Sequence, residues 1–336
     1  MKKFKYFLKR LFKIDYHRFF YTFKKIKAES NRSTAYLLFG MLVCAIKYNA
    51  GYMDYKIAQM YKLNSKQRET VITRGISNDI VRRMNPKDKW YIFDNKALFN
   101  STFKENIQRK WLVINTETSY EDFCNFTNGL NSFIYKPLEG SSGQGIQKYS
   151  ESDWKENTQT FLSNLQLKGS AIIEELVVQH PILAALNASS VNTIRVATLL
   201  GDKQEGIVYA FIRIGNGSVM DNVDCGGMAA RVDLESGTIL TVGADKAGNV
   251  FEYHPATHKR IIGVTIPFWE ETKWLCIQAA KKVPEMRFIA WDVAITEKGP
   301  VFIEGNSFPS HAVPQFSAHY PDGIGILQEF QKFIDI

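Results

Sequence analysis

The sequence predicts an α+β protein with a helical N-terminal region. Residues 1–83 show mostly helical spacing of apolar residues, whereas short strand-like runs alternate with helical segments after Pro86. The chain has 336 residues, 45% apolar and 23% charged, an ordinary globular composition that allows a sizeable core. The longest uncharged apolar run, residues 35–46, is shorter than the roughly 20 residues that cross a bilayer, so it predicts a buried helix and no membrane span.

The positive charge of the chain is concentrated at its start. The net charge is +8, yet residues 1–27 hold ten Lys or Arg against one Asp, which leaves the remainder at about −1. Large apolar residues recur in this segment at three-and-four spacing, which predicts a basic amphipathic helix. Two interpretations stay open: contact with an anionic membrane surface, or packing on the protein's own domain. A nucleic-acid-binding function is not favoured, because the basicity is confined to one end.

The predicted elements after residue 30 follow in a clear order. Residues 31–83 continue helical, and further helices are expected at 120–130, 152–167, 268–282 and 322–334. Strands are expected at 110–115, 132–137, 170–176, 192–200, 206–215, 237–243, 288–296 and 300–306.

The four cysteines are scattered along the chain and predict neither a zinc site nor a disulfide framework. They form no CxxC pair and have no histidine at metal-ligand spacing, and no cleavable signal peptide is apparent. We therefore expect a reduced, cytoplasmic setting, with peripheral contact to the inner face of the cell membrane as an open alternative.

A lysine followed by a glycine-rich loop indicates an anion-binding segment. Lys136 lies at the end of the strand-like run 132–137, and glycines in the next residues let backbone N–H groups approach an anion closely. This loop is neither a Walker A motif nor a dinucleotide fingerprint, and taken alone a plain hairpin turn would explain it. Its residues are Gly140, Ser141, Ser142, Gly143, Gln144 and Gly145.

A second segment, residues 290–306, predicts a metal site on a β-hairpin. Asp292 lies on one strand, and Glu304 and Asn306 lie on the next, so a turn at 296–300 brings three oxygen-bearing side chains together. Apolar neighbours predict that both carboxylates are buried, and buried unpaired carboxylates are unfavourable. A hard cation between them resolves this, and Mg²⁺ suits such ligands together with phosphate oxygens.

The lysine, the loop and the carboxylate hairpin, in this order, resemble the ATP-grasp superfamily and most closely its sugar-transfer-associated branch in polysaccharide biosynthesis. The resemblance runs from about Asp94 to the end of the chain. It implies an ATP-grasp fold at 91–336, made of a lysine and glycine-loop unit (91–175) and a metal-binding unit (176–336), after a basic helix (1–27) and a helical region (28–90).

The resemblance also implies roles for individual residues. Lys96 and Lys136 would bind the α- and β-phosphates under the loop 140–145, and Asp292, Glu304 and Asn306 would bind Mg²⁺. Adenine contacts would come from Glu174, Glu175, Leu176 and Val177. Asn192 and Arg195 would face the phosphates or the acceptor site.

Two departures from the family pattern concern charged positions. Residues 179–181 lack the acidic residue that commonly binds the ribose, and Ala290 stands where many peptide-forming members have an arginine. Arg195, Arg213 or Arg231 could supply the missing charge. Each of these arginines could equally form a structural ion pair, Lys96 could be a solvated helix lysine, and Glu174 could cap a strand end.

The function implied is that of an ATP- and Mg²⁺-dependent carboxylate-amine ligase acting through an acylphosphate. Its substrate would be a small or lipid-linked sugar precursor with carboxylate and amine groups, and His311 is a candidate acceptor contact. Two alternatives stay open: a kinase that leaves the phosphoryl group on a hydroxyl, and a non-catalytic nucleotide-binding scaffold. The sequence does not indicate an oligomeric state.

Overall fold

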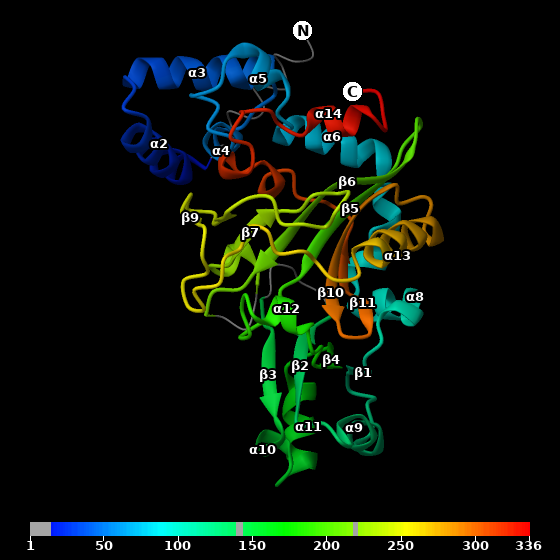
Figure 1. Cartoon of the computed structure of the whole chain (residues 1–336). Coiled ribbons are helices and arrows are strands. Elements are labelled where there is room, and N and C mark those ends of the chain that lie inside the picture. Colours follow the sequence, from blue (N-terminus) through cyan, green and yellow to red (C-terminus); the bar gives the residue numbers. More distant parts are fainter. Residues whose placement is uncertain (1–14, 139–143, 218–220) are drawn as a thin grey trace.

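The computed structural model describes residues 15–138, 144–217 and 221–336 (Figure 1). They form a helical N-terminal region, a small four-stranded sheet and a larger seven-stranded sheet, which confirms the predicted α+β class. Residues 1–14 of the expected basic helix and loop residues Gly140 to Gly143 lie outside the described residues.

The helical N-terminal region lies at the end of the molecule opposite the small sheet (Figure 1). The first helix of the described residues begins after Asp15, whose carboxylate accepts a hydrogen bond from the Arg18 N–H (3.0 Å), and it ends at Asn31 in a left-handed conformation. The helices here are α2 (Tyr16–Ser30), α3 (Thr34–Lys47), α4 (Tyr52–Ile57), α5 (Ser65–Glu69) and α6 (Arg74–Met84), followed by η1 (Lys87–Lys89), α7 (Tyr91–Asp94), α8 (Lys96–Thr102) and η2 (Lys104–Asn106).

The prediction that residues 35–46 form a buried helix is right for the helix but wrong for much of the burial. Leu37 and Cys44 are buried in α3, whereas Phe39 is 68% exposed. The reason is that only one side of α3 packs against the neighbouring helices of this region, and uniformly apolar residues carry no directional signal in sequence. The other exposed apolar residues of α3 are Tyr36, Leu38, Leu42 and Ile46.

The small sheet has the strand order β1-β4-β2-β3, with all pairs antiparallel. Phe133 on its central strand is fully buried among aromatic rings of the covering helices, including Phe123 and Trp154. The elements are β1 (Trp111–Ile114), α9 (Tyr120–Thr127), β2 (Ser132–Pro137), β3 (Gln147–Ser150), α10 (Glu151–Trp154), α11 (Thr158–Leu167) and β4 (Ala171–Glu175).

The large sheet has the order β11-β10-β5-β6-β7-β8-β9 and is also antiparallel. The hairpin between β10 and β11 turns at Gly299, whose φ of 119° suits glycine. The elements are α12 (Pro181–Ala184), β5 (Ile194–Leu200), β6 (Glu205–Ile214), η3 (Val223–Cys225), β7 (Met228–Arg231), β8 (Gly243–Ala244), β9 (Val250–Phe251), α13 (Trp269–Lys282), β10 (Phe288–Thr296), β11 (Gly299–Asn306), η4 (Val313–Gln315), η5 (Ser317–His319) and α14 (Leu327–Gln331).

Different elements pack on the two faces of the large sheet. One face packs against α13 and against α7 and α8, whose Phe93 and Phe99 contact Trp291. The other face is covered in part by α6 and by the C-terminal segment, through residues such as Ile80 and Phe330. Residues 91–107 therefore pack on the large sheet, although they precede the small sheet in sequence.

The prediction of a strand at 237–243 is wrong for most of these residues. Only Gly243 lies in a strand, and residues 238 and 239 form isolated bridges. Three strands that were not expected, β3, β7 and β9, are short, and a run of two to four residues is too brief to show alternation.

Candidate active site

Asp292 lies at the centre of a charged cluster on one face of the large sheet. In the strand register it pairs with Arg195 on β5 and with Glu304 on β11. Residues paired directly across antiparallel strands point to the same face, so all three side chains meet there. Arg195 donates through Nε to Oδ1 of Asp292 and through Nη2 to Oδ2 (2.8 Å), a bidentate pair.

Arg213 on β6 is the second guanidinium on Asp292. Its Nη2 donates to Oδ2 of Asp292 (2.7 Å) and to Oγ1 of Thr193 (2.8 Å). Its Nε lies 3.5 Å from Oδ2 of Asp221, which also accepts from the N–H of Thr193 (2.8 Å). Asp221 therefore fixes Arg213 from the side opposite Asp292.

The two carboxylates of the hairpin have pKa values shifted in opposite directions. Burial raises the pKa of Asp292, but Arg195 and Arg213 more than offset this and hold it below its usual range. Burial and the neighbouring charge of Asp292 raise the pKa of Glu304. This contrast follows from two carboxylates in contact, fully buried Asp292 and half-buried Glu304, of which only Asp292 has direct guanidinium partners.

The donor set of the hairpin fits a hard cation. Fully buried Asp292 and half-buried Glu304 approach each other on adjacent strands, and Asn306 follows Glu304, where its Nδ2 donates to the Ala290 carbonyl (3.4 Å). Carboxylate oxygens have about four acceptor positions between them, so Asp292 can accept from its arginines and still coordinate an ion. No group of three or more His, Cys, Asp or Glu surrounds one point in the described ranges, so phosphate and water oxygens would complete the coordination.

A second charged cluster surrounds Glu174 on β4. Its Oε2 accepts from Nζ of Lys136 on β2, and its Oε1 accepts from Nη2 of Arg109 (2.7 Å) and Nδ2 of Asn100 (2.7 Å). Burial raises the pKa of Glu174, yet the charges of Lys136 and Arg109 outweigh burial and lower it to about 2. Glu174 is therefore ionised and holds Lys136 in place.

Lys96 and Arg109 join the two clusters. Lys96 donates from Nζ to the Leu138 carbonyl (3.4 Å), and its pKa is lowered by burial, with Glu304, Lys136 and Glu174 as its nearest charges. Arg109 Nη1 donates to the Phe302 carbonyl (2.6 Å) on β11, two residues before Glu304.

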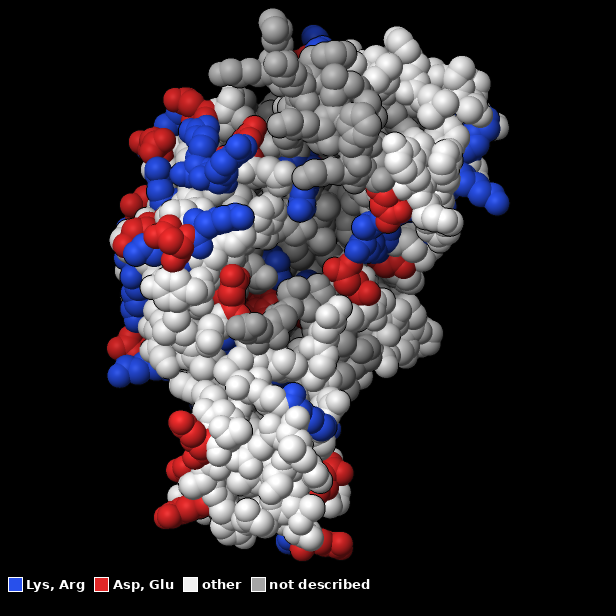
Figure 2. All heavy atoms as spheres, turned by 180° about the vertical axis from the view of Figure 1, so that it is seen from behind, with Lys and Arg blue, Asp and Glu red and all other residues white. Residues whose placement is uncertain are grey.

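Figure 2 shows the back of the molecule hollowed above the narrow small-sheet end, with both Lys or Arg and Asp or Glu atoms inside the hollow. The structure thus brings Lys96, expected to bind nucleotide, near Glu304, expected to bind metal, although the two are far apart in sequence.

The residues expected to meet adenine lie where β4 leaves the small sheet. Glu175 ends the strand, with Oε2 accepting from the Lys110 N–H (3.1 Å), and Leu176 and Val177 are half-buried in the connection to the large sheet. The side chain of Glu174 points into its ion cluster and not along this connection. Of the glycine-rich loop, Gln144 and Gly145 are described and exposed, and Gly145 has a φ of 74°.

Asn192 lies outside the charged clusters. Its buried amide donates to Oε1 of Gln179 and to the carbonyls of Leu183 and Asn187, and its oxygen accepts from the Gly215 N–H (3.2 Å). These bonds use its donors and its acceptor to hold the segment before β5.

Arg231 and His311 also have partners of their own. Arg231 lies over the ring of Tyr320, 4.6 Å from its centroid. His311 lies with Nε2 2.9 Å from Oδ1 of Asp54 in α4, so it ties the C-terminal segment to the helical N-terminal region.

Sequence reasoning missed three residues of the site: Arg109, Asp221 and Asn100. Arg109 precedes β1 in a polar stretch, and Asp221 lies in a loop, so neither has a periodic pattern around it. Buried charges need partners, and this requirement alone predicts a cation near Glu174 and an anion near Arg213. It does not identify which residues supply them.

Comparison with known proteins gives one family and distant structural likenesses. No curated protein matches the chain. Solved structures similar to it include the ATP-grasp ligase PsnB complexed with minimal precursor (12% identity, 73% of this chain and 64% of that one, TM-score 0.43) and D-cycloserine synthetase DcsG (12%, 76% of each chain, 0.42). A third is the D-alanine-D-alanine ligase from Coxiella burnetii (10%, 72% and 59%, 0.40). The chain spans less than two thirds of the length of PsnB.

The family model for sugar-transfer associated ATP-grasp proteins matches residues 76–331, about three quarters of the chain. This match confirms the expected ATP-grasp fold and, with it, ATP as the nucleotide. The chain belongs to the sugar-transfer associated ATP-grasp family.

Proposed function

We propose that this protein is an ATP- and Mg²⁺-dependent carboxylate-amine ligase that acts through an acylphosphate on a sugar or polysaccharide precursor. The observation that carries the proposal is the convergence of Arg195 and Arg213 on Asp292, beside Glu304. A carboxylate donor is an anion that needs cations and no general base, whereas a kinase needs a carboxylate free to accept a hydroxyl proton. Asp292 is instead occupied by two guanidinium groups.

The two charged clusters bind different parts of the nucleotide complex in this proposal. ATP with its Mg²⁺ would supply an electrophilic γ-phosphoryl group. Lys96 and Lys136 bind phosphate oxygens, with Glu174 holding Lys136 in position. The metal ion would be held by Asp292, Glu304 and Asn306.

Arg195 and Arg213 orient the carboxylate and stabilise charge on the transferring phosphoryl group. A carboxylate oxygen of the donor bonds to the γ-phosphorus as ADP leaves. The acceptor amine then bonds to the carbonyl carbon, phosphate leaves, and the amine loses a proton to give the amide.

The test is product analysis by phosphorus NMR and mass spectrometry, with ATP, Mg²⁺ and panels of sugar carboxylates and amines. We expect ADP, free phosphate and an amide from wild type, and at least about a hundredfold less from Asp292→Asn. Asp88→Asn, at an exposed position, is the matched control and should keep full activity. A stable phosphoester would replace the ligase by a kinase, and nucleotide binding without any turnover would favour a non-catalytic scaffold.

We also propose peripheral contact between the helical N-terminal region and an anionic membrane, where lipid-linked precursors would be met. None of the helices in the described part of the chain is long and apolar enough to cross a bilayer. Phe20 and Tyr21 on α2 and Phe39 on α3 are nevertheless exposed, and Lys24 and Lys27 also lie on α2. Aromatic residues beside lysines suit the headgroup layer of an anionic bilayer.

A further inference from the structure

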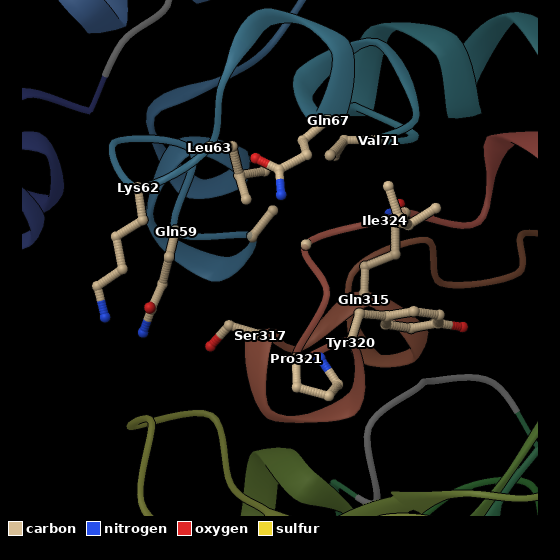
Figure 3. A pocket seen from close by; sticks show the side chains of 13 residues that line it. Gln59, Lys62, Leu63, Gln67, Val71, Gln315, Ser317, Tyr320, Pro321 and Ile324 are labelled. Carbon is tan, nitrogen blue, oxygen red and sulfur yellow. The ribbon is translucent and has the colours of Figure 1, made fainter.

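A pocket of about 310 Å³ lies between the helical N-terminal region and the C-terminal segment (Figure 3). One wall is the stretch that links α4 and α5, and the other is residues 315–325. Its volume is at the lower end of the range for small-molecule sites. The lining residues are Ala58, Gln59, Lys62, Leu63, Gln67, Val71, Gln315, Ser317, Tyr320, Pro321, Gly323, Ile324 and Gly325.

The polar groups of this pocket are neutral except for one lysine. No Asp or Glu lines it, and Lys62 is exposed at its edge. Gln315 is used structurally, since its amide bonds the N–H and the carbonyl of Ile72 (both 2.8 Å), and Gln67 donates to the Asp322 carbonyl (2.8 Å).

Three other polar side chains of the pocket are uncommitted. Gln59, Ser317 and Tyr320 have no side-chain hydrogen bond within the described part of the chain, and Figure 3 shows Gln59 and Ser317 on facing walls. These three side chains are available to a ligand.

Gln59 has a strained backbone at this position. Its φ is 45°, a left-handed conformation that glycine adopts without penalty and that other residues adopt at a cost of about 1 kcal/mol or more. Strain of this kind is typical of ligand-binding positions.

The pocket is connected to the charged cluster along one face of the large sheet. Tyr320 lies against Arg231, 4.6 Å from the guanidinium carbon to the ring centroid. Arg231 pairs with Phe211, which pairs with Arg195, so two strand spacings, about 10 Å, separate the backbones of the two arginines. A substrate of more than one ring could therefore occupy the pocket and reach the reacting centre.

We infer that this pocket binds a sugar unit that carries a phosphate, as the acceptor-side recognition site of the enzyme. The inference rests on the proposed function and names its substrate class. Amide and hydroxyl groups are donors and acceptors at once, which matches sugar hydroxyls, and a tyrosine ring packs on the apolar face of a pyranose. Lys62 at the edge pairs with the phosphate, which is shared by free sugar phosphates and lipid-linked sugars.

Calorimetry with hexose 1-phosphates and with the parent hexoses tests the inference on the full chain. We expect millimolar or tighter binding of a hexose 1-phosphate, weakened about three- to tenfold in Gln59→Ala and in Tyr320→Phe. Lys62→Ala should weaken the phosphate ester and leave binding of the parent sugar unchanged. Gln278→Ala, in a separate pocket on α13, is the control and should bind like wild type.

Hydrogen exchange on wild type gives a second readout that needs no variant. A hexose 1-phosphate should slow exchange at residues 58–63 and 315–325, and a lipid-linked sugar in vesicles should do the same if the lipid form is the source. Unchanged exchange there, or equal binding by wild type and Gln59→Ala, overturns the inference. Binding of ATP with Mg²⁺ is measured in parallel and separates the two proposals. If the chain does not bind ATP, the ligase proposal fails, whereas binding of a hexose 1-phosphate still supports the sugar-binding site.

Discussion

Asp292 and Arg195 face each other in register on adjacent strands, and the guanidinium holds both carboxylate oxygens at a fully buried position. A lysine cannot reproduce this two-point contact. We therefore expect Arg195→Lys to lower kcat for ADP formation about a hundredfold and to change ATP affinity little. Arg260→Lys, in an exposed pair with Glu252, should behave like wild type. Equal kcat values for Arg195→Lys and wild type would assign Arg195 a structural role.

Lys136 should contribute mainly to nucleotide binding. It lies on β2 with Nζ against Glu174, beside the connection between the two sheets. Lys136→Met should weaken ATP binding about ten- to a hundredfold, because it removes a charge-assisted contact to phosphate. Lys148→Met, on neighbouring β3 and exposed, is the matched control. Calorimetric titration with ATP and Mg²⁺ checks this, and equal affinities would exclude Lys136 from the phosphate site.

Glu174 should make stability depend on acid pH. Its pKa falls from 4.5 to about 2 on folding, so its contribution is fully present above pH 4.5 and is lost as the pH falls toward 2. A pKa shift of this size corresponds to a contribution on the order of 3 kcal/mol to the free energy of unfolding. Urea unfolding of wild type between pH 5 and 2.5 should show this loss, and Glu174→Gln should show a smaller one.

The exposed Glu117→Gln serves as the control for the titration and should keep the wild-type pH dependence. Matching pH profiles for wild type and Glu174→Gln would contradict the assignment. Should Glu174→Gln not fold at neutral pH, the wild-type profile alone still decides whether the loss occurs.

Sequence patterns predicted the hairpin of the proposed metal site well. Apolar runs on either side of Asp292 and Glu304 fix the strands, and β10 spans the predicted residues without an error. Apolar runs failed to predict burial in α3, because residues 35–46 carry no charged or strongly polar side chain that would mark the exposed side of the helix.

Partners that depend on tertiary contact could not be predicted. Asn192 lies in a motif that resembles the family, yet its amide bonds the backbone of Leu183 in α12 and of Gly215 after β6. His311 follows β11 closely in sequence, but the chain turns away and places it against Asp54, 257 residues earlier.

Asp54 should stabilise the joint between the helical N-terminal region and the C-terminal segment. Besides His311, its carboxylate accepts from the N–H groups of Gly51 (2.6 Å) and Arg74 (3.0 Å). Asp54→Ala should lower the free energy of unfolding by about 2 to 3 kcal/mol, because buried donors lose their acceptor. Asp79→Ala, in an exposed pair with Arg82, should change it by less than about 1 kcal/mol. Urea denaturation at pH 7 measures both, and equal effects would show that the joint does not depend on Asp54.

The exposed apolar surface of α2 and α3 should decide membrane binding. Figure 2 shows this corner of the molecule as mostly uncharged, with Lys or Arg atoms at its edge. Deleting residues 1–27 is a poor test, because Ile26 is fully buried and its removal would disturb the helical core. Phe20→Asp with Phe39→Asp changes only exposed positions and should abolish flotation with vesicles containing phosphatidylglycerol.

Leu167→Asp, at an exposed apolar position on α11, is the matched control and should float like wild type. Binding should also fall steeply with salt, since the lysines act through screened charge. If the double variant floats like wild type, α2 and α3 do not contact the bilayer. If wild type floats equally with neutral vesicles, the electrostatic part of the proposal is wrong.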